Sequence, residues 1–311
     1  MSKIKEFIKD ISPLNNRSEM PMLIYLIKVI IIFWFVKFGS EIICEGAVIG
    51  LHFACGKNPL QGEIFEGNVI TLITYFGYAL MVGIFFLYWK LFQKKTIAEL
   101  GFTKKCGTYL IGMIIGAILV VVSVFSIIAT GAITYNGKLD NIDYLYIFLM
   151  FGVFICQGMM EEVLCRGIVM QLLRNKTSIP IAVGVSTILF TIPHILNMTG
   201  ESAVIIILAI INLILISLIF SALTICTGSI WAACGFHSIW NFILYNILGL
   251  NLSGNDELTA AIFDMKSVGS NILNGGVYGI EASVVTAAIL AVVLIIIIVI
   301  YDRKGSVIDG I

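Results

Sequence analysis

Residues 202–225 read SAVIIILAIINLILISLIFSALTI and contain no charged side chain. A helix needs about 20 consecutive apolar residues to cross the roughly 30 Å hydrocarbon core of a bilayer, so this segment predicts a transmembrane helix. Seven further segments have a similar character, although the first of them is interrupted by charges. They are 22–50, 68–92, 107–133, 143–173, 179–198, 229–250 and 281–301. The sequence therefore predicts an all-α polytopic membrane protein with about eight transmembrane helices in one bundle.

The composition of the whole chain agrees with this interpretation. Of its 311 residues, 59% are hydrophobic and only 12% are charged, whereas a soluble globular domain has about 45–50% apolar and about 25% charged residues. So few ionic groups cannot cover a surface that faces water. Because the connections between the apolar segments are short, we expect residues 1–311 to form a single membrane domain. The formal net charge of zero gives no indication of a nucleic-acid partner.

Basic residues cluster at alternate connections. They precede the first apolar segment, occupy the polar connection 93–105, follow residue 173 and follow residue 301, whereas acidic residues dominate most of the other connections. Positive charge in short loops marks the cytoplasmic side. We therefore expect the protein in the cell membrane with both termini in the cytoplasm. The connection 93–105 then predicts a cytoplasmic amphipathic helix or elbow, and 251–280 an extracytoplasmic loop or cap.

The first segment, 22–50, contains Lys28, Lys37, Glu41 and Glu45. It allows two interpretations, a single long tilted helix or one span followed by a re-entrant or interfacial piece. Two full crossings here would put the lysines of 93–105 outside the cell, so eight spans fit the charge pattern and nine do not. Snorkelling and partial i,i+4 pairing account for the four charges themselves.

Ionisable side chains deep in a span cost about 2.5–3.5 kcal/mol each on insertion scales, so they are candidates for function. The span 143–173 contains GMMEEVLCRG at 158–167. Glu162 and Arg166 are four residues apart and can pair on one helix face. Glu161 points about 100° away from Glu162 and has no cation four residues later. A carboxylate without a paired cation is suited to act as a general base. The alternative is that both glutamates only bind the arginine and fix helix packing.

Two later spans each contain a histidine at the end of a short polar motif. In FTIPH, Phe190 and His194 share a helix face, and Pro193 removes a backbone hydrogen bond beside the imidazole. In HSIWN, His237 and Asn241 share a face and could both donate hydrogen bonds to a developing oxyanion. Each motif, taken alone, is explained as well by a packed core histidine or by an interhelical hydrogen bond.

The three motifs, in this order, resemble those of the CPBP family of intramembrane proteases, also called the Abi family. That family includes the CAAX prenyl endopeptidases and bacterial members linked to bacteriocin processing or self-immunity. Its pattern is Glu-Glu-x-x-x-Arg, Phe-x-x-x-His and His-x-x-x-Asn, and the chain has it at 161–166, 190–194 and 237–241. The resemblance covers a core of about 145–248.

The resemblance implies six site residues. Glu161 would activate a water molecule for attack on a peptide bond, and His194 would orient that water. His237 and Asn241 would stabilise the oxyanion, while Glu162 and Arg166 would hold the helix in place. No cofactor is then required. Members of the family were first called metalloproteases, and zinc bound by Glu161, His194 and His237 is the alternative.

Three functions compete on this basis. The first is an intramembrane endopeptidase that acts on a peptide or protein in or near the bilayer, with membrane lipid as its surroundings. The second is a non-catalytic scaffold or immunity membrane protein that keeps the same buried polar core. The third, a proton-coupled transporter, is disfavoured because no inverted repeat is visible. The Ile- and Lys-rich composition is typical of a low-GC bacterium, which favours a peptide pheromone, bacteriocin or leader remnant as substrate.

Overall fold

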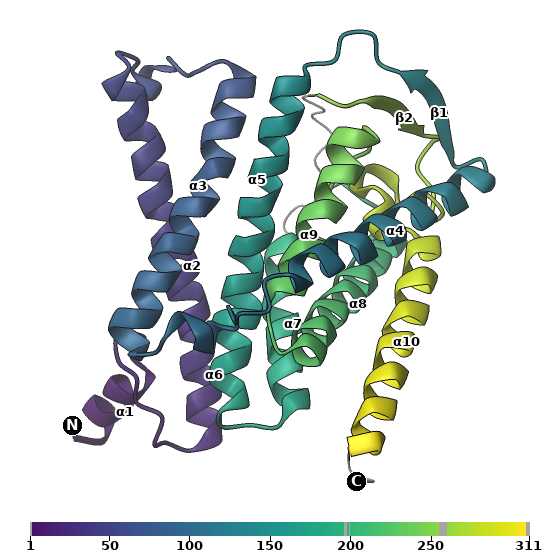
Figure 1. The fold of residues 1–311 in the computed structure, drawn as a ribbon. Helices are drawn as coiled ribbons and strands as arrows, with labels where there is room; N and C mark the ends of the chain where they lie inside the picture. The colour runs from purple at the N-terminus through teal and green to yellow at the C-terminus, as the bar shows by residue number, and fades with distance from the viewer. Residues whose placement is uncertain (1, 196–197, 199, 255–259, 309–311) are drawn as a thin grey trace.

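The computed structural model describes residues 2–195, 198, 200–254 and 260–308. Helices account for 73% of the chain, which confirms the all-α prediction. Figure 1 shows them as one bundle, with the N-terminal helix α1 (Ser2–Ile11) and the C-terminal end of α10 (Val284–Ile308) at the same end. A pair of short strands lies at the opposite end.

Within the described residues, six helical segments are long and apolar enough to cross a membrane. Two shorter helices, of which the one at Ile179–Ile195 is apolar, coincide with the remaining predicted spans, although 196–197 of the span predicted at 179–198 lie outside the described residues. The six segments are α2 (Met22–Ala54), α3 (Gly67–Tyr88) with η2 (Trp89–Gln93), α4 (Thr108–Ala129), α5 (Tyr144–Glu162) with η4 (Val163–Val169) and α6 (Met170–Arg174), α8 (Ala203–Thr227), and α10; the two shorter ones are α7 (Ile179–Ile195) and α9 (Trp231–Phe242) with η5 (Ile243–Ile247).

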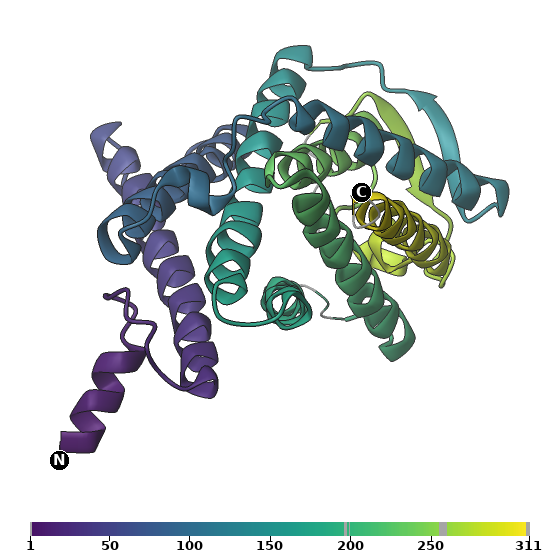
Figure 2. The ribbon, with the colours of Figure 1, turned by 60° about the horizontal axis from the view of Figure 1, so that its bottom comes forward.

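The prediction of a multi-pass helical membrane protein is thus confirmed, while the number of eight spans stays a prediction. Viewed from its lower end, the bundle has α2 and α3 on one side and α8, α9 and α10 on the other, with α5 between them (Figure 2). Helix α5 packs on α3 on one flank and on α9 on the other.

The first segment is one continuous helix. The 33 residues of α2 run from Met22 to Ala54 without a break, a length of about 50 Å at 1.5 Å per residue. This exceeds the roughly 30 Å of hydrocarbon, so the helix crosses the bilayer once and extends beyond it. The single-helix interpretation is confirmed, and a re-entrant piece is excluded for this segment.

The connection 93–105 is an elbow. It contains one short 3₁₀ helix, η3 (Ile97–Leu100), whose Leu100 is completely buried. Thr96 and Glu99 form a capping box at its start, and the backbone N–H of Thr96 donates to the Glu99 carboxylate at 2.8 Å. This hydrogen bond lowers the pKa of Glu99 because it stabilises the ionised carboxylate.

Residues 255–259 of the predicted polar loop 251–280 lie outside the described residues, and the rest of the loop contains more regular structure than predicted. Its strand β2 (Phe263–Ser267) pairs antiparallel with β1 (Ile133–Lys138), with Ile133 opposite Ser267. Two 3₁₀ turns, η6 (Gly276–Tyr278) and η7 (Ile280–Ala282), lead into α10; a third, η1 (Pro59–Gln61), follows α2. These strands were not predicted because each has only five or six residues and its partner lies more than 100 residues away.

Helices α4 and α9 approach each other closely at glycines. A Cβ on Gly235 of α9 would lie 2.0 Å from the Tyr109 carbonyl oxygen, and one on Gly112 of α4 would lie 1.9 Å from the Ala232 carbonyl oxygen. Small residues let helix backbones pack in this way in membranes, where association depends on close van der Waals contact. The position of α9, which contains His237 and Asn241, therefore depends on these glycines.

We expect Gly235→Ala to destabilise the protein by about 1–3 kcal/mol or more, because the added methyl overlaps backbone atoms that cannot move independently. The matched control is Gly83→Ala in α3, where a Cβ meets nothing within 4 Å. Thermal unfolding in detergent measures both. Equal melting temperatures for the two variants would contradict the close α4–α9 contact.

Candidate active site

Four of the six side chains selected from the sequence line one cavity inside the bundle. Glu161 lies near the end of α5, His194 in the last turn of α7, and His237 and Asn241 one turn apart on α9. The cavity has a volume of about 320 Å³, and α2, α3, α8 and α10 complete its wall. The structure thus brings together residues from three helices that are up to 80 positions apart in the sequence.

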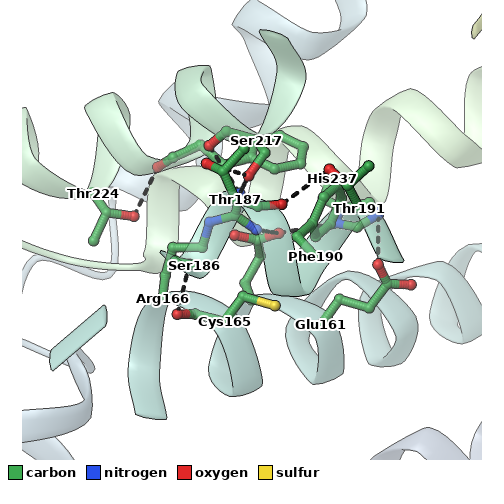
Figure 3. Close-up of polar contacts among 12 residues, drawn as sticks. Glu161, Cys165, Arg166, Ser186, Thr187, Phe190, Thr191, Ser217, Thr224 and His237 are labelled. Atoms are coloured by element: carbon green, nitrogen blue, oxygen red, sulfur yellow. Dashed lines mark hydrogen bonds and ion pairs between the residues drawn. The ribbon is translucent and has the colours of Figure 1, made fainter. Parts of the chain in front are cut away.

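The Glu161 carboxylate faces both imidazoles. Its Oε2 atom lies 3.7 Å from Nε2 of His194 and 3.9 Å from Nε2 of His237. Both separations are too long for a direct hydrogen bond, and Oε2 has no hydrogen-bond partner among the described residues. The other oxygen, Oε1, accepts a long hydrogen bond of 3.5 Å from Gln157. Figure 3 shows Glu161 extended toward the ring nitrogens.

The partners of the two histidines determine which ring nitrogen carries the proton. Nδ1 of His194 lies 2.8 Å from the Phe190 carbonyl oxygen, and Nδ1 of His237 lies 3.1 Å from Oε1 of Glu162. Carbonyl and carboxylate oxygens only accept, so Nδ1 is the donor in each ring. In the neutral rings both Nε2 lone pairs then point at Glu161. Three acceptors then converge, and a water molecule between them would have a carboxylate and two imidazole nitrogens to donate to.

Glu162 and Arg166 lie behind this cavity and do not line it. Both side chains are completely buried, and their predicted i,i+4 pairing is confirmed at 3.0 Å. Arg166 also donates to the carbonyl and hydroxyl oxygens of Ser217 on α8, at 2.8 and 2.5 Å. Its guanidinium stacks 4.7 Å from the Phe190 ring, a favourable cation–π distance. This placement agrees with the holding role that the resemblance implied.

Local features of α5 and α9 position these groups. Gly158 of α5 allows α9 to approach, since a Cβ there would lie 2.8 Å from the Ser238 hydroxyl. Directly after Glu162 the helix widens into the π-helical segment η4, which carries Arg166. Such π-bulges are frequent at functional sites because they re-aim side chains without ending the helix.

Sequence reasoning missed Gln157, which connects two of the candidate residues. Asn241 donates to the Gln157 side-chain oxygen at 3.4 Å, and Gln157 donates to Glu161. Gln157 therefore links the side-chain amide of Asn241 to the Glu161 carboxylate. A neutral glutamine in an apolar span gave no signal, although its spacing of four residues before Glu161 would have been compatible with this contact.

Sequence reasoning also missed the contribution of α2. Lys37 and Glu41 form the predicted ion pair, and both line the same cavity. Lys37 lies near the middle of the 33-residue helix α2. The cavity, rather than the membrane surface, surrounds this pair.

The described residues contain no group of three or more His, Cys, Asp and Glu side chains arranged to hold a metal ion. The zinc ligands considered above, Glu161, His194 and His237, come nearest to such a group. Ligand atoms bound about 2.0–2.1 Å from a tetrahedral zinc are about 3.3–3.4 Å apart, whereas these separations are 3.7 and 3.9 Å. The three side chains do not fit zinc in the arrangement that the structure has.

Residues 143–243 match the family described as Type II CAAX prenyl endopeptidase Rce1-like. This segment contains α5 through α9 and all three motifs, and its bounds are close to the predicted core of 145–248. No curated protein and no solved structure matches the chain. The match confirms the resemblance to the CAAX and CPBP proteases that the motifs indicated.

We expect Arg166→Met to lower the free energy of unfolding by about 3–5 kcal/mol, because it leaves the Glu162 carboxylate buried without its cation. The double variant Glu162→Gln/Arg166→Met should be more stable than Arg166→Met alone, since no buried charge remains unpaired. Steric trapping in bicelles measures both. Lys95→Met, which removes an exposed ion pair with Glu99, is the control and should cost less than about 1 kcal/mol. A double variant no more stable than the single one would contradict the pairing.

Proposed function

We propose that this chain, whose residues 143–243 match the Rce1-like CAAX prenyl endopeptidases, hydrolyses a peptide bond with a water molecule activated by Glu161. The single observation that supports this most directly is the convergence of the Glu161 carboxylate with two imidazole Nε2 atoms at the wall of one cavity. A carboxylate in a partly buried site, held without a cation beside it, is well suited to accept a proton.

In the proposed reaction, Glu161 accepts a proton from water while the water oxygen attacks the carbonyl carbon of the substrate peptide bond. His194 accepts a hydrogen bond from the same water through its unprotonated Nε2 and so fixes its orientation. The carbonyl oxygen becomes an oxyanion. The proton on Glu161 then passes to the amide nitrogen as the C–N bond breaks, which releases a carboxylic acid and an amine.

Asn241 is the proposed donor to the oxyanion, because its side-chain N–H groups need no change of protonation to donate. His237 differs from the role that the resemblance implied. Its Nδ1 already donates to Glu162, so its Nε2 can donate only in the imidazolium form. We propose that neutral His237 helps Glu161 to hold the water, and that it supports the oxyanion only after it has taken up a proton.

We propose a location in the cell membrane with both termini cytoplasmic. The positive charge near both termini and in the connection after α6 supports this orientation. It is also supported by the position of α1 and the end of α10 at one end of the bundle, opposite the β1–β2 pair (Figure 1).

We expect Glu161→Gln to lower the rate of peptide hydrolysis by about 10²–10⁴-fold, since the amide cannot act as a base. Purified protein in proteoliposomes is assayed on an internally quenched farnesylated CAAX peptide, and the peptides of cells with wild-type or variant protein are compared by mass spectrometry. Glu45→Gln is the control, because Glu45 is an exposed carboxylate of α2. Unchanged biological activity and an unchanged peptide pattern in Glu161→Gln would favour the non-catalytic scaffold or immunity protein instead.

We propose hydrolysis without a metal ion, and expect 1,10-phenanthroline or EDTA to leave the rate of the proteoliposome assay unchanged. Elemental analysis of the purified protein should then find much less than one zinc per chain. The geometric support is the wide spacing between the Glu161 carboxylate and the imidazoles of His194 and His237. Loss of activity on chelation, with recovery on addition of zinc, would establish the zinc alternative.

A further inference from the structure

Glu281, in the turn η7 before α10, lines the same cavity as Glu161. Its carboxylate accepts three hydrogen bonds, from the Trp240 indole at 3.2 Å and from the backbone N–H and hydroxyl of Ser253 at 2.7 and 2.8 Å. All three donors are neutral. These three hydrogen bonds fix the Glu281 carboxylate in one orientation, so a ligand that binds beside it does not have to order this side chain first.

The three carboxylates of the cavity wall differ in what compensates their charge. Glu41 has the ammonium group of Lys37, whereas the two neutral imidazoles within 4 Å of Glu161 can share a hydrogen-bonded water with it but carry no compensating charge. Across the part of the chain that the structure describes, Glu281 has no Lys, Arg or His within ion-pair distance. A partly buried carboxylate without a cation is unfavourable, and an ionised carboxylate has room for about four hydrogen bonds. One acceptor position of Glu281 is therefore left for a ligand.

Two more acceptors belong to residues that line the same cavity. Asn212 of α8 donates its amide N–H to the Ser283 carbonyl oxygen at 2.9 Å, two residues after Glu281. This bond fixes the amide orientation and leaves Oδ1 without a partner among the described residues. The Thr286 hydroxyl, in the first turn of α10, likewise has none there. Both residues are at least nine-tenths buried and both line the cavity.

We infer that Glu281, Asn212 and Thr286 form a subsite that binds a cationic group of the substrate, an ammonium or a guanidinium. This inference rests on the proposed function, because it assigns the cavity a peptide. A group with several N–H donors and a positive charge satisfies one carboxylate and two unpaired acceptors together. Carboxylate or other anionic groups are disfavoured here, since they would add to the negative charge of this wall.

The position of the subsite connects it to the reacting groups. Trp240, which donates to Glu281, lies on α9 between His237 and Asn241. A substrate held at Glu281 is thus aligned with the helix that supplies the oxyanion donor. Asn212 lies within the segment 143–243 that matches the family, whereas Glu281 and Thr286 lie outside it.

A binding experiment tests the subsite without requiring cleavage. Purified protein in detergent is titrated with N-dodecylguanidinium or with N-dodecylurea, its neutral counterpart, and thermal unfolding is recorded. We expect the guanidinium to bind wild type at least about tenfold more tightly than the urea, which one charge-assisted hydrogen bond can account for. Glu281→Gln should abolish the difference. Equal binding of the two probes to wild type would overturn the inference, whether or not the protein cleaves peptides.

The control is Glu201→Gln. Glu201 accepts hydrogen bonds from the backbone N–H groups of Val277 and Tyr278 and so holds the same loop, but it does not line the cavity. It should keep the preference for guanidinium. If Glu281→Gln fails to fold, Thr286→Val provides the test, because replacing an unpartnered hydroxyl by a methyl of similar shape is not expected to destabilise the protein. If folded Thr286→Val kept the full preference for guanidinium over urea, the Thr286 hydroxyl would not be part of the subsite, and the proposed set of three residues would be wrong.

A peptide experiment identifies the source of the cation. Internally quenched peptides carry arginine or its neutral analogue citrulline at each position in turn, with the N-terminus free or acetylated, and are assayed in proteoliposomes. We expect one position, or the free N-terminus, to raise kcat/KM about tenfold in wild type but not in Glu281→Gln. Cleavage that depends on Glu161 but ignores arginine and the free amine would overturn the subsite alone. Cleavage that persists in Glu161→Gln would overturn the proposed function instead.

Discussion

The buried ion pair between Glu162 and Arg166 is the interaction on which the arrangement of the site depends. A guanidinium deep in a membrane bundle is tolerated only when its charge and its donors are matched. Here Glu162 supplies the charge, Ser217 supplies two acceptors, and Phe190 supplies an aromatic face. These contacts join α5 and η4 to α7 and α8. Through Nδ1 of His237, the same carboxylate also orients a side chain of α9.

This pair also explains why two adjacent glutamates behave differently. Because Glu162 is directed toward Arg166, the helix geometry turns Glu161 about 100° away, toward α7 and α9. There it meets the Nε2 atoms of His194 and His237, whose opposite nitrogens are already bonded to fixed acceptors. The tautomers are thus set by second contacts, as in many histidine-containing sites. One glutamate neutralises a structural cation, which leaves the other as an uncompensated carboxylate at the cavity wall.

The sequence was sufficient for features that depend on local spacing. Apolar segments predicted the helices, and i,i+4 spacing predicted both the Glu162–Arg166 and the Lys37–Glu41 pairs. It was insufficient where residues from separate elements meet. Gln157 is uncharged in an apolar span, and Glu281 is the first residue of the predicted span 281–301, where nothing in the local sequence indicated its partners on α9 and at Ser253. Strands β1 and β2 pair across more than 100 residues, a contact that no local pattern of five or six residues specifies.

The residues that line the cavity come from two parts of the chain, the segment that matches the protease family and the helices outside it. Helices α5 through α9, within the segment that matches the protease family, supply Glu161, both histidines and Asn241. Helices α2, α3 and α10 lie outside that segment, and they contribute Lys37, Glu41 and the tyrosines of α3 as well as the wall next to Glu281. The matched segment also contains the whole buried ion pair, which joins α5 and η4 to α7 and α8. In the part of the chain that the structure describes, neither Glu281 nor Thr286 contacts that pair, so substitutions at these two positions can change what the cavity binds and leave the pair in place.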